Sequence, residues 1–369
     1  MRIRGAVLEE IGRTRPYADS TPIRVVELEL DDPAAGELLV RIEVAGLCHS
    51  DLSVVDGNRV RPVPMLLGHE AAGIVEAVGS DVGDIALGDR VVMTFLPRCG
   101  DCDACATDGL TPCTFGSASN NAGTLLGGGS RIHRGTEVVK HHLGVSGFAT
   151  HAVVNRSSVV PVPADVPADV AAVLGCAVLT GGGAVINAGR PRPGQRVIVV
   201  GLGGVGMAAL LTVLALDGLE VVGVDAVPQK LSRARELGAQ LALTPDEARE
   251  SALTAPVVIE AAGAVRAFEL ALELTGPGGR MVTVGLPAPT AMASVSPLAL
   301  VAGGRSIIGS YLGSAVPARD IPTFVGLWRT GRLPVEELIT ETIAFEDINA
   351  GMDQLADGLA VRQVIRFDG

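Results

Sequence analysis

The stretch that decides the fold is VIVVGLGGVGMAALLTVLALDGLEVVGVD, which runs from Val197 to Asp225. It opens with β-branched residues in the pattern of a buried parallel strand. The glycine pattern G-x-G-x-x-G follows, and then come an apolar helical run and a second strand that ends at Asp225. This order of strand, turn, helix and strand predicts a unit that binds a dinucleotide.

Each glycine of this pattern has a physical task. Gly201 makes the tight turn out of the strand, Gly203 lets the backbone approach a pyrophosphate, and Gly206 lets helix and strand pack closely. Gly204 and Val205 complete the loop. The helix that begins here directs free N–H groups and the positive end of its dipole towards the phosphates.

Asp225 lies 19 residues after Gly206, where a carboxylate can accept a hydrogen bond from a ribose 2′-OH. An alternative interpretation is a membrane helix, because residues 197–216 carry no charge and are long enough to span a bilayer. The glycines in the first half of this run and the strand and aspartate after it favour the dinucleotide unit.

Length, charge and cysteine content narrow the class of protein. With 369 residues the chain suggests roughly two domains, and 48% apolar residues are ample for a core. The net charge of −12 argues against nucleic-acid binding, which needs a basic patch. The N-terminus, MRIRGAVLEEIG, lacks the apolar core of a signal peptide, so we expect a soluble cytoplasmic protein with no membrane partner.

The pattern of elements changes along the chain. Short alternating strands with glycine turns up to about residue 95 predict a barrel-like β domain, and residues 96–147 look loop-like. Strand and helix patterns alternate from about 178 to 312, which predicts a doubly wound parallel sheet. We therefore expect a β-rich domain over 1–177, a cofactor domain over 178–312, and a tail over 313–369 that returns to the first domain.

Four of the six cysteines follow the spacing C-x₂-C-x₂-C-x₇-C, at Cys99, Cys102, Cys105 and Cys113. Four thiolates can surround one zinc ion tetrahedrally and leave no position for water, so this site is predicted to be structural. An iron–sulfur cluster or disulfides are the alternatives. The lobe over about 96–115 has few apolar residues to bury, which favours a metal.

Cys48, His69 and Cys176 form a second candidate set, because a catalytic zinc commonly has three protein ligands and one open position. Spacing alone is a weak argument for this set. Buried cysteines are common core residues, and a single histidine more often makes only hydrogen bonds.

Several segments together resemble the zinc-dependent medium-chain alcohol dehydrogenases, close to the liver-type and glutathione-dependent formaldehyde dehydrogenase branch. The matching segments occur in the family's order and span most of the chain: Cys48-His49-Ser50-Asp51, Gly68-His69-Glu70, the four-cysteine lobe, Gly175-Cys176, Gly201 to Gly206, Val284-Gly285 and Val361 to Ile365. The resemblance implies a GroES-like β-barrel catalytic domain joined to a Rossmann cofactor domain.

The resemblance also implies the roles of the residues around the catalytic zinc. Cys48, His69 and Cys176 would bind the ion, with Glu70 just behind it and counted among the metal-site residues. Asp51 would hold the far nitrogen of His69. The hydroxyl of Ser50 would bond the substrate oxygen and begin the proton path.

The implied cofactor is NAD, with two zinc ions per chain, one catalytic and one structural. The cofactor contacts implied by the resemblance, beyond the glycine loop, are His49 and Arg362 on the pyrophosphate, Thr180 against the nicotinamide, Asp225 and Lys230 on the adenosine ribose, and Val284. The Asp225 carboxylate would repel the 2′-phosphate of NADP.

The implied reaction interconverts alcohols with aldehydes or ketones. Zinc binds the alcohol oxygen as a Lewis acid and lowers its pKa, and the zinc-bound alkoxide releases hydride to the nicotinamide. One alternative is a formaldehyde dehydrogenase that acts on an S-hydroxymethyl thiol adduct. A zinc-free enoyl or quinone reductase using NADPH, or a non-catalytic binding protein, would have no need for the Cys48, His69 and Cys176 set.

Two positions depart from the family pattern. Ser53 stands where many relatives have a histidine that ends the proton path, so the exit of the proton is open. His142 stands where an aromatic residue is common, and it either recognises a polar substrate group or faces solvent. His133, His141 and His151 are interpreted as non-ligands.

The expected partners are a small alcohol or aldehyde and further copies of the chain. Relatives are homodimers or homotetramers, and the run Arg305 to Leu312 lies where they pair their cofactor domains edge to edge. The sequence does not choose between two and four chains, and it does not specify the natural substrate.

Overall fold

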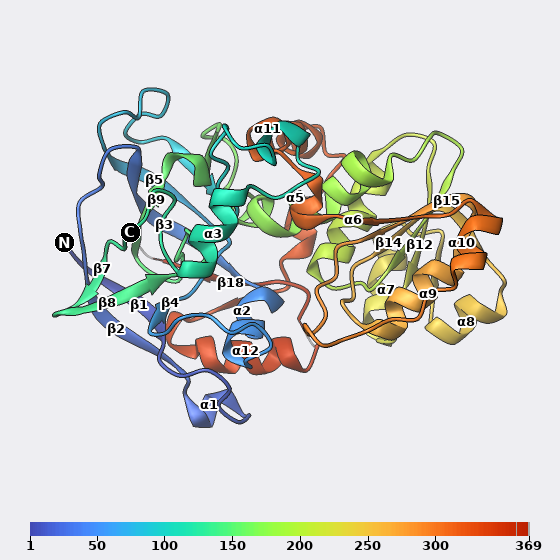
Figure 1. The fold of residues 1–369 in the computed structure, drawn as a ribbon, viewed down its shortest axis with the longest axis horizontal. Coiled ribbons are helices and arrows are strands. Elements are labelled where there is room, and N and C mark those ends of the chain that lie inside the picture. Colours follow the sequence, from blue (N-terminus) through green and yellow to red (C-terminus); the bar gives the residue numbers. More distant parts are fainter. Residues whose placement is uncertain (359, 368–369) are drawn as a thin grey trace. The chain divides into compact units, whose positions relative to one another are not determined.

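The computed structural model describes residues 1–358 and 360–367, which divide into two compact units. The first unit consists of Met1–Cys176 and Ile339–Gly369, and the second consists of Ala177–Leu338. Figure 1 shows the ribbon of both units coloured along the sequence.

The first unit is built on β-sheets. A closed barrel has the order β1 (Arg2–Leu8), β2 (Ile23–Leu30), β7 (Ile132–Arg134), β8 (Glu137–His141) and β4 (Met65–Leu66). A second sheet has the order β10 (Val159–Val162), β6 (Arg90–Met93), β5 (Ala71–Val78), β3 (Glu37–Leu47), β18 (Gln363–Arg366) and β17 (Glu341–Ile343), and β9 (His151–Asn155) also pairs with β3. The chain's last strands, β17 and β18, therefore extend the sheet that contains β3.

Short helices fill the connections of this unit. They are α1 (Tyr17–Ser20), α2 (His49–Val55), α3 (Thr114–Ala122), α4 (Ala168–Val173) and α12 (Ile348–Ala356). Along the long strand β3 the side chains of Leu38, Val40 and Ile42 lie in the core. Arg41 and Glu43 alternate with them and are only half-buried, which explains the alternation of apolar and polar residues.

The second unit is a parallel sheet in the order β13 (Leu241–Leu243), β12 (Glu220–Val224), β11 (Arg196–Val200), β14 (Ala255–Glu260), β15 (Thr275–Thr283) and β16 (Ser306–Gly309). In chain order this is 3-2-1-4-5-6, the strand order of the doubly wound dinucleotide fold. The helices of this unit are α5 (Leu179–Gly183), α6 (Gly204–Ala215), α7 (Pro228–Glu236), α8 (Pro245–Glu250), α9 (Val265–Glu273), α10 (Pro297–Gly303) and α11 (Pro317–Arg329). The fold class predicted from the sequence is confirmed.

The uncharged run 197–216 forms buried β11, the glycine turn and α6, so the membrane interpretation of this run is wrong. A different helical stretch, Ala168–Gly189, is apolar and long enough to cross a bilayer, but 89% of its most apolar window is buried inside the protein. Helices of this kind also form the cores of water-soluble domains, so its apolar composition is explained by packing.

The structure differs from the sequence-based expectation in two ranges of the chain. The first range, 96–147, contains strands β7 and β8 as well as a helix. Within the loop-like range 96–147, residues 114–122 form helix α3, because Cys113 caps its first turn by accepting a hydrogen bond from the N–H of Gly116 at 3.3 Å. The expected returning tail 313–369 begins later, since residues 313–338 pack within the second unit. There the Asn187 amide donates to Asp320 at 3.1 Å.

Candidate active site

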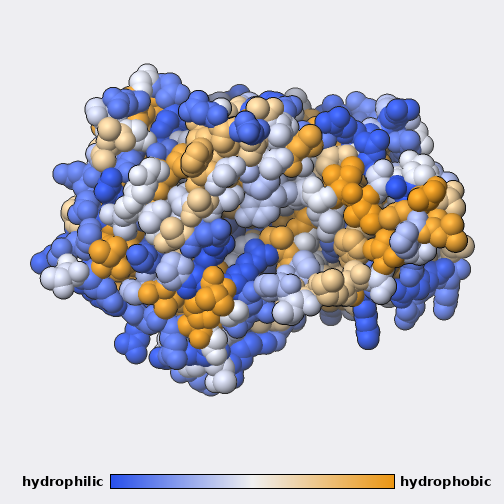
Figure 2. Space-filling view, in the orientation of Figure 1, coloured by the Kyte–Doolittle hydropathy of each residue, from blue (hydrophilic) through white to orange (hydrophobic). Residues whose placement is uncertain are grey.

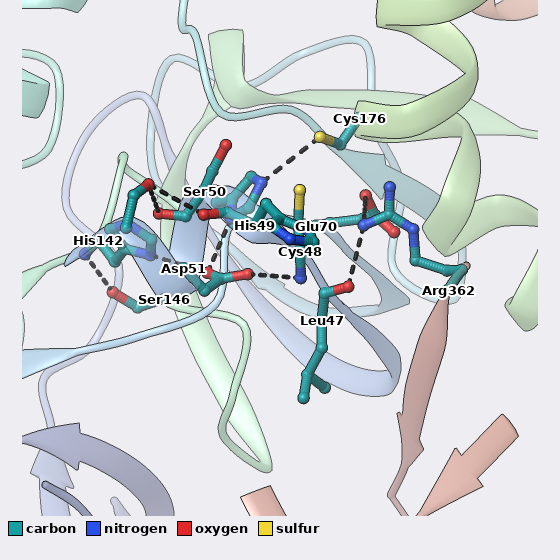
Figure 3. A network of polar contacts seen from close by, with 12 residues as sticks. Leu47, Cys48, His49, Ser50, Asp51, Glu70, His142, Ser146, Cys176 and Arg362 are labelled. Carbon is teal, nitrogen blue, oxygen red and sulfur yellow. Dashed lines mark hydrogen bonds and ion pairs between the residues drawn. The ribbon is translucent and has the colours of Figure 1, made fainter. Parts of the chain in front are cut away.

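Cys48, His69 and Cys176 converge inside the first unit. Their ligand atoms lie within 4.8 Å of one another, and Cys176 Sγ is 3.4 Å from His69 Nε2. All three side chains are buried. Figure 3 labels the two cysteines, Cys48 and Cys176, together with the residues around them. Two thiolates and one imidazole form a donor set that suits a catalytic zinc with a fourth position for substrate, so the residues present fit the metal that the sequence implies.

Different elements deliver these three ligands. Cys48 is the N-cap of α2, directly after β3, and His69 lies between β4 and β5. Cys176 lies in a π-helical stretch, Leu174–Val178, and such stretches are frequent at functional sites. The hydrogen bond between the two thiols holds the pKa of Cys48 well below its ordinary value and raises the pKa of Cys176.

Asp51 links two of the ligands, His69 and Cys48. Its Oδ1 lies 2.8 Å from His69 Nδ1, and its Oδ2 accepts a hydrogen bond from the backbone N–H of Cys48 at 3.0 Å. When Nε2 binds a metal, the Asp51 carboxylate would keep the proton of His69 on Nδ1. Burial raises the pKa of Asp51, but the charge of His69 and its hydrogen bonds outweigh burial and lower the pKa overall.

Glu70 and Arg362 form a buried pair behind the ligands. Arg362 Nη1 lies 3.3 Å from Glu70 Oε2 and donates to the carbonyl of Leu47 at 3.0 Å. Burial raises the pKa of Glu70 to about 7. The Arg362 guanidinium is only 2% exposed, so the structure places it beside Glu70, and its contact with a cofactor pyrophosphate stays a prediction.

The residues of the expected proton path lie on α2. Ser50 is half-buried and His49 is exposed. Ser53 donates its hydroxyl to the carbonyl of His49 at 2.9 Å and to that of Ser50 at 3.1 Å. Its side chain is therefore bonded to its own helix, which explains how a serine is accommodated where relatives carry a histidine.

The structure contradicts the interpretation that His142 faces solvent. Its side chain is 1% exposed, its Nδ1 lies 3.3 Å from Asp51 Oδ1, and its ring packs edge-on against His69 with centroids 5.6 Å apart. On another side of His69, Phe95 makes a similar contact at 5.5 Å. Burial lowers the pKa of His142, so its imidazole is neutral near pH 7.

The four cysteines of the lobe also converge. Their sulfurs lie within 4.8 Å of one another, and the pairs Cys99–Cys105 and Cys102–Cys113 are 3.9 Å apart. Sulfurs bound tetrahedrally at about 2.3 Å from zinc are about 3.8 Å apart. These cysteines are free thiols. The geometry fits a closed four-thiolate metal site, and the disulfide alternative is wrong.

The glycine loop of the second unit has the geometry that its pattern predicts. Gly201 has φ +91°, and a Cβ on Gly206 would lie 1.7 Å from the carbonyl oxygen of Gly201. A Cβ on Gly203, the N-cap of α6, would meet no atom within 4 Å. Gly201 and Gly206 are thus required by the protein's own backbone and packing, whereas the space beside Gly203 is open for a ligand.

Asp225 supports the same loop. Its Oδ2 accepts from the N–H of Leu202 at 2.7 Å, and its Oδ1 accepts from the N–H of Val227 at 2.9 Å. Lys230 is half-buried on α7. The second lone pair of each Asp225 oxygen remains for a ribose hydroxyl, so the predicted role is compatible with this structural one.

Glu260 is a buried charged residue at the end of β14 that the sequence analysis did not single out. Its buried carboxylate accepts from the N–H groups of Ala262 and Gly263, both at 2.8 Å, and from the hydroxyl of Thr283 at 2.6 Å. The Glu260 carbonyl also accepts from the N–H of Val284 at 2.9 Å. A glutamate that ends an otherwise apolar strand was the available signal. Thr180 is buried on α5.

Known proteins match this chain along its whole length. The alcohol dehydrogenase GroES-like domain matches residues 34–164, and the zinc-binding dehydrogenase domain matches residues 204–329. The NDMA-dependent alcohol dehydrogenase of Amycolatopsis methanolica is 33% identical, with 99% of each chain covered.

Solved structures agree. The alcohol dehydrogenase zinc-binding domain protein from Burkholderia ambifaria has a TM-score of 0.91 at 31% identity, and benzyl alcohol dehydrogenase from Acinetobacter calcoaceticus has 0.90 at 29%, each with both chains fully covered. The liver-type or formaldehyde dehydrogenase branch stays a prediction, because these relatives are bacterial alcohol dehydrogenases of other kinds. The chain belongs to the zinc-binding alcohol dehydrogenase family.

Proposed function

We propose that this protein is a zinc- and NAD-dependent oxidoreductase that interconverts alcohols with aldehydes or ketones. The observation that carries the proposal is the convergence of Cys48, His69 and Cys176 around one point, with Asp51 hydrogen-bonded to His69. A reductase without zinc would have no use for this donor set, and a binding protein would have no use for Ser50 beside it.

The chain's own residues hold the metal, orient its ligands and offer a group that can take the substrate proton. A bound zinc supplies Lewis-acid polarisation of the alcohol or carbonyl oxygen. Cys48, His69 and Cys176 hold the ion, and Asp51 fixes the His69 ring. In the described part of the chain the Ser50 hydroxyl makes no hydrogen bond, so it is available to take the proton of the substrate hydroxyl.

The second unit supplies the proposed NAD site. The open space beside Gly203 at the N-terminus of α6 suits a pyrophosphate, and the carboxylate of Asp225 favours a free ribose 2′-OH over a 2′-phosphate. No arginine stands in the segment Asp225-Ala226-Val227 to bind a 2′-phosphate.

The test is a panel of alcohols, including benzyl alcohol, assayed with NAD and with NADP and read as absorbance of the reduced cofactor. Cys48→Ala runs beside the wild type. Activity with NAD that disappears in Cys48→Ala is the expected result. Equal activity of the two proteins would refute the catalytic metal site, and a preference for NADP would refute the role of Asp225.

A second candidate concerns the electron acceptor. One relative, 33% identical, is named as an NDMA-dependent alcohol dehydrogenase. The same panel should therefore be run with NDMA in place of added NAD. Turnover with NDMA alone would show that free NAD is not the co-substrate. If all alcohols are inert with both acceptors, formaldehyde with a low-molecular-weight thiol tests the thiol-adduct alternative.

A further inference from the structure

His142 lies in a turn that fixes its position tightly. Its carbonyl accepts from the N–H groups of Val145 and Ser146 at 3.1 and 3.2 Å, and its N–H donates to Ser146 Oγ at 3.0 Å. Leu143 and Ser146 both have positive φ, at +52° and +54°. Non-glycine residues in this conformation cost about 1–2 kcal/mol each and persist only where the surrounding structure requires them.

This turn places the imidazole against Asp51, inside the metal site (Figure 3). Asp51 Oδ1 lies 3.3 Å from His142 Nδ1. Among the described residues neither ring nitrogen has a well-aligned hydrogen-bond partner. A buried polar group in this state costs about 1–3 kcal/mol. A phenylalanine would fill the same space without that cost, so the polar ring requires an explanation.

His142 could in principle bind a metal together with Asp51 and His69, since the ligand atoms of the three residues lie within 4.8 Å of one another. The contact between His69 Nδ1 and Asp51 Oδ1 speaks against this. At 2.8 Å it is a direct hydrogen bond, and it occupies the nitrogen that such an ion would need. His69 Nε2 already faces Cys176.

A hydrogen bond to Asp51 explains the ring better. Oδ1 has a second lone pair beside the one that His69 uses, and rotation of the His142 ring brings its Nδ1–H onto that lone pair. The other oxygen, Oδ2, is held by the N–H of Cys48. With His142 as a third donor the carboxylate can no longer turn away from His69.

We propose that His142 is a positioning residue of the metal site, which donates a hydrogen bond through Nδ1 to Asp51 and thereby holds that carboxylate against His69. This inference rests on the proposed function, because it assumes that Cys48, His69 and Cys176 hold zinc. Its consequence is slower loss of the metal, since partners behind a ligand typically change metal affinity by about 10–100-fold.

The experiment measures zinc release from purified holoenzyme to a chromophoric chelator at neutral pH. The variants are His142→Phe, which keeps a ring, His142→Leu, and His142→Asn, which has nearly the shape of leucine but keeps an N–H donor at the position of Nδ1. Cys48→Ala identifies the release phase of the catalytic site. The ion of the four-cysteine lobe serves as an internal reference for correct folding.

We expect His142→Phe and His142→Leu to release the catalytic ion about tenfold faster, and His142→Asn to stay within about threefold of wild type by retaining the donor. The phase of the lobe should be unchanged in all of them. Wild-type release rates in the Phe and Leu variants would overturn the inference, and so would an Asn variant as fast as the Leu variant. If the Cys48→Ala variant shows the same release phases as the wild type, the catalytic metal site itself is refuted.

Discussion

At the scale of single residues, Gly46 is the position where the site depends most directly on the lack of a side chain. A Cβ there would lie 2.1 Å from Glu70 Oε1, inside a fully buried pair with Arg362. Gly46→Ala must therefore displace Glu70, at a cost of about 1–3 kcal/mol. We expect it to lower the melting temperature and to reduce kcat/KM at least about tenfold, because the carboxylate behind the ligands moves.

The matched control is Gly83→Ala, whose new methyl group would meet no atom within 4 Å. Calorimetry and initial rates on both variants separate the two effects. The Gly83 variant should be as stable and as active as wild type. If Gly46→Ala behaves like this control, Glu70 does not need its observed position.

His141 makes a prediction about acid stability. Its ring is fully buried, and its Nε2 accepts from the N–H of Arg131 at 3.2 Å. Burial lowers the pKa of His141 to about 3. The unfolded chain binds the proton at its ordinary pKa of about 6.5. The stability that neutral His141 contributes is therefore fully present above pH 6.5, and it is lost progressively as the pH falls from there towards 3.

We expect this histidine to account for about 1 kcal/mol of the stability lost between about pH 7 and 5.5. His141→Gln keeps an acceptor for Arg131 but cannot take up a proton in this range. Denaturant unfolding of both proteins at the two pH values provides the measurement. Equal losses of stability in wild type and variant would show that other groups set the acid limit.

Resemblance to a family supplied the ligands of the catalytic site in advance, but the sequence did not supply the surroundings of those ligands. Cys48, His69 and Cys176 are separated by long stretches of chain, and only the fold brings them together. The burial of His142 depends on a turn with two positive-φ residues that no local pattern marks. The sequence therefore showed that His142 departs from the family pattern, but it did not show that His142 contacts Asp51.

At the scale of elements, the loop between β11 and α6 contains glycines that are required for two different reasons, packing and ligand binding. Gly206 and Gly203 lie three residues apart, but a Cβ on Gly206 would strike a carbonyl at 1.7 Å, whereas one on Gly203 would meet nothing within 4 Å. Gly206→Ala should therefore damage both the stability of the second unit and NAD binding. Gly203→Ala should keep the wild-type melting temperature and lose at least about tenfold in NAD affinity.

Thermal unfolding and titration of NAD by fluorescence check both expectations. Wild-type NAD affinity in a well-folded Gly203→Ala would mean that the pyrophosphate does not approach this loop. The two substitutions add the same methyl group, so any difference between them reports its surroundings.

Elements with a strong repeating pattern were predicted well from the sequence, and elements stabilised by single contacts were not. Strand β11 forms at Arg196–Val200, where the β-branched residues predict a buried parallel strand. Helix α3 was missed, since its stability comes from the Cys113 cap and from the Asn120 amide, which donates to the carbonyl of Phe95 at 2.7 Å. Contacts of this kind depend on tertiary structure, which periodicity does not report.

At the scale of the whole molecule, the second unit has an end strand with exposed apolar side chains nearby. Strand β16 is the last strand of its sheet in the described topology, and apolar side chains of α10 nearby are exposed, Leu298 to 77% and Val301 to 82%. Figure 2 shows apolar residues gathered where Figure 1 labels α10 and β15. An uncovered edge strand with an apolar border favours pairing with another chain.

We propose that two copies of the chain pair through β16 about a twofold axis, with α10 of each copy beside the junction. Replacing Leu298 and Val301 together by glutamate places like charges at that border, so the double variant should be monomeric when light scattering finds the wild type to be a dimer or tetramer. Val60→Glu is the control, because Val60 is 80% exposed in the first unit.

A double variant that keeps the wild-type mass would show that copies meet elsewhere, and a monomeric wild type would refute the pairing. Because the net charge is −12, the measurement belongs at physiological salt, where repulsion between distant charges is largely screened.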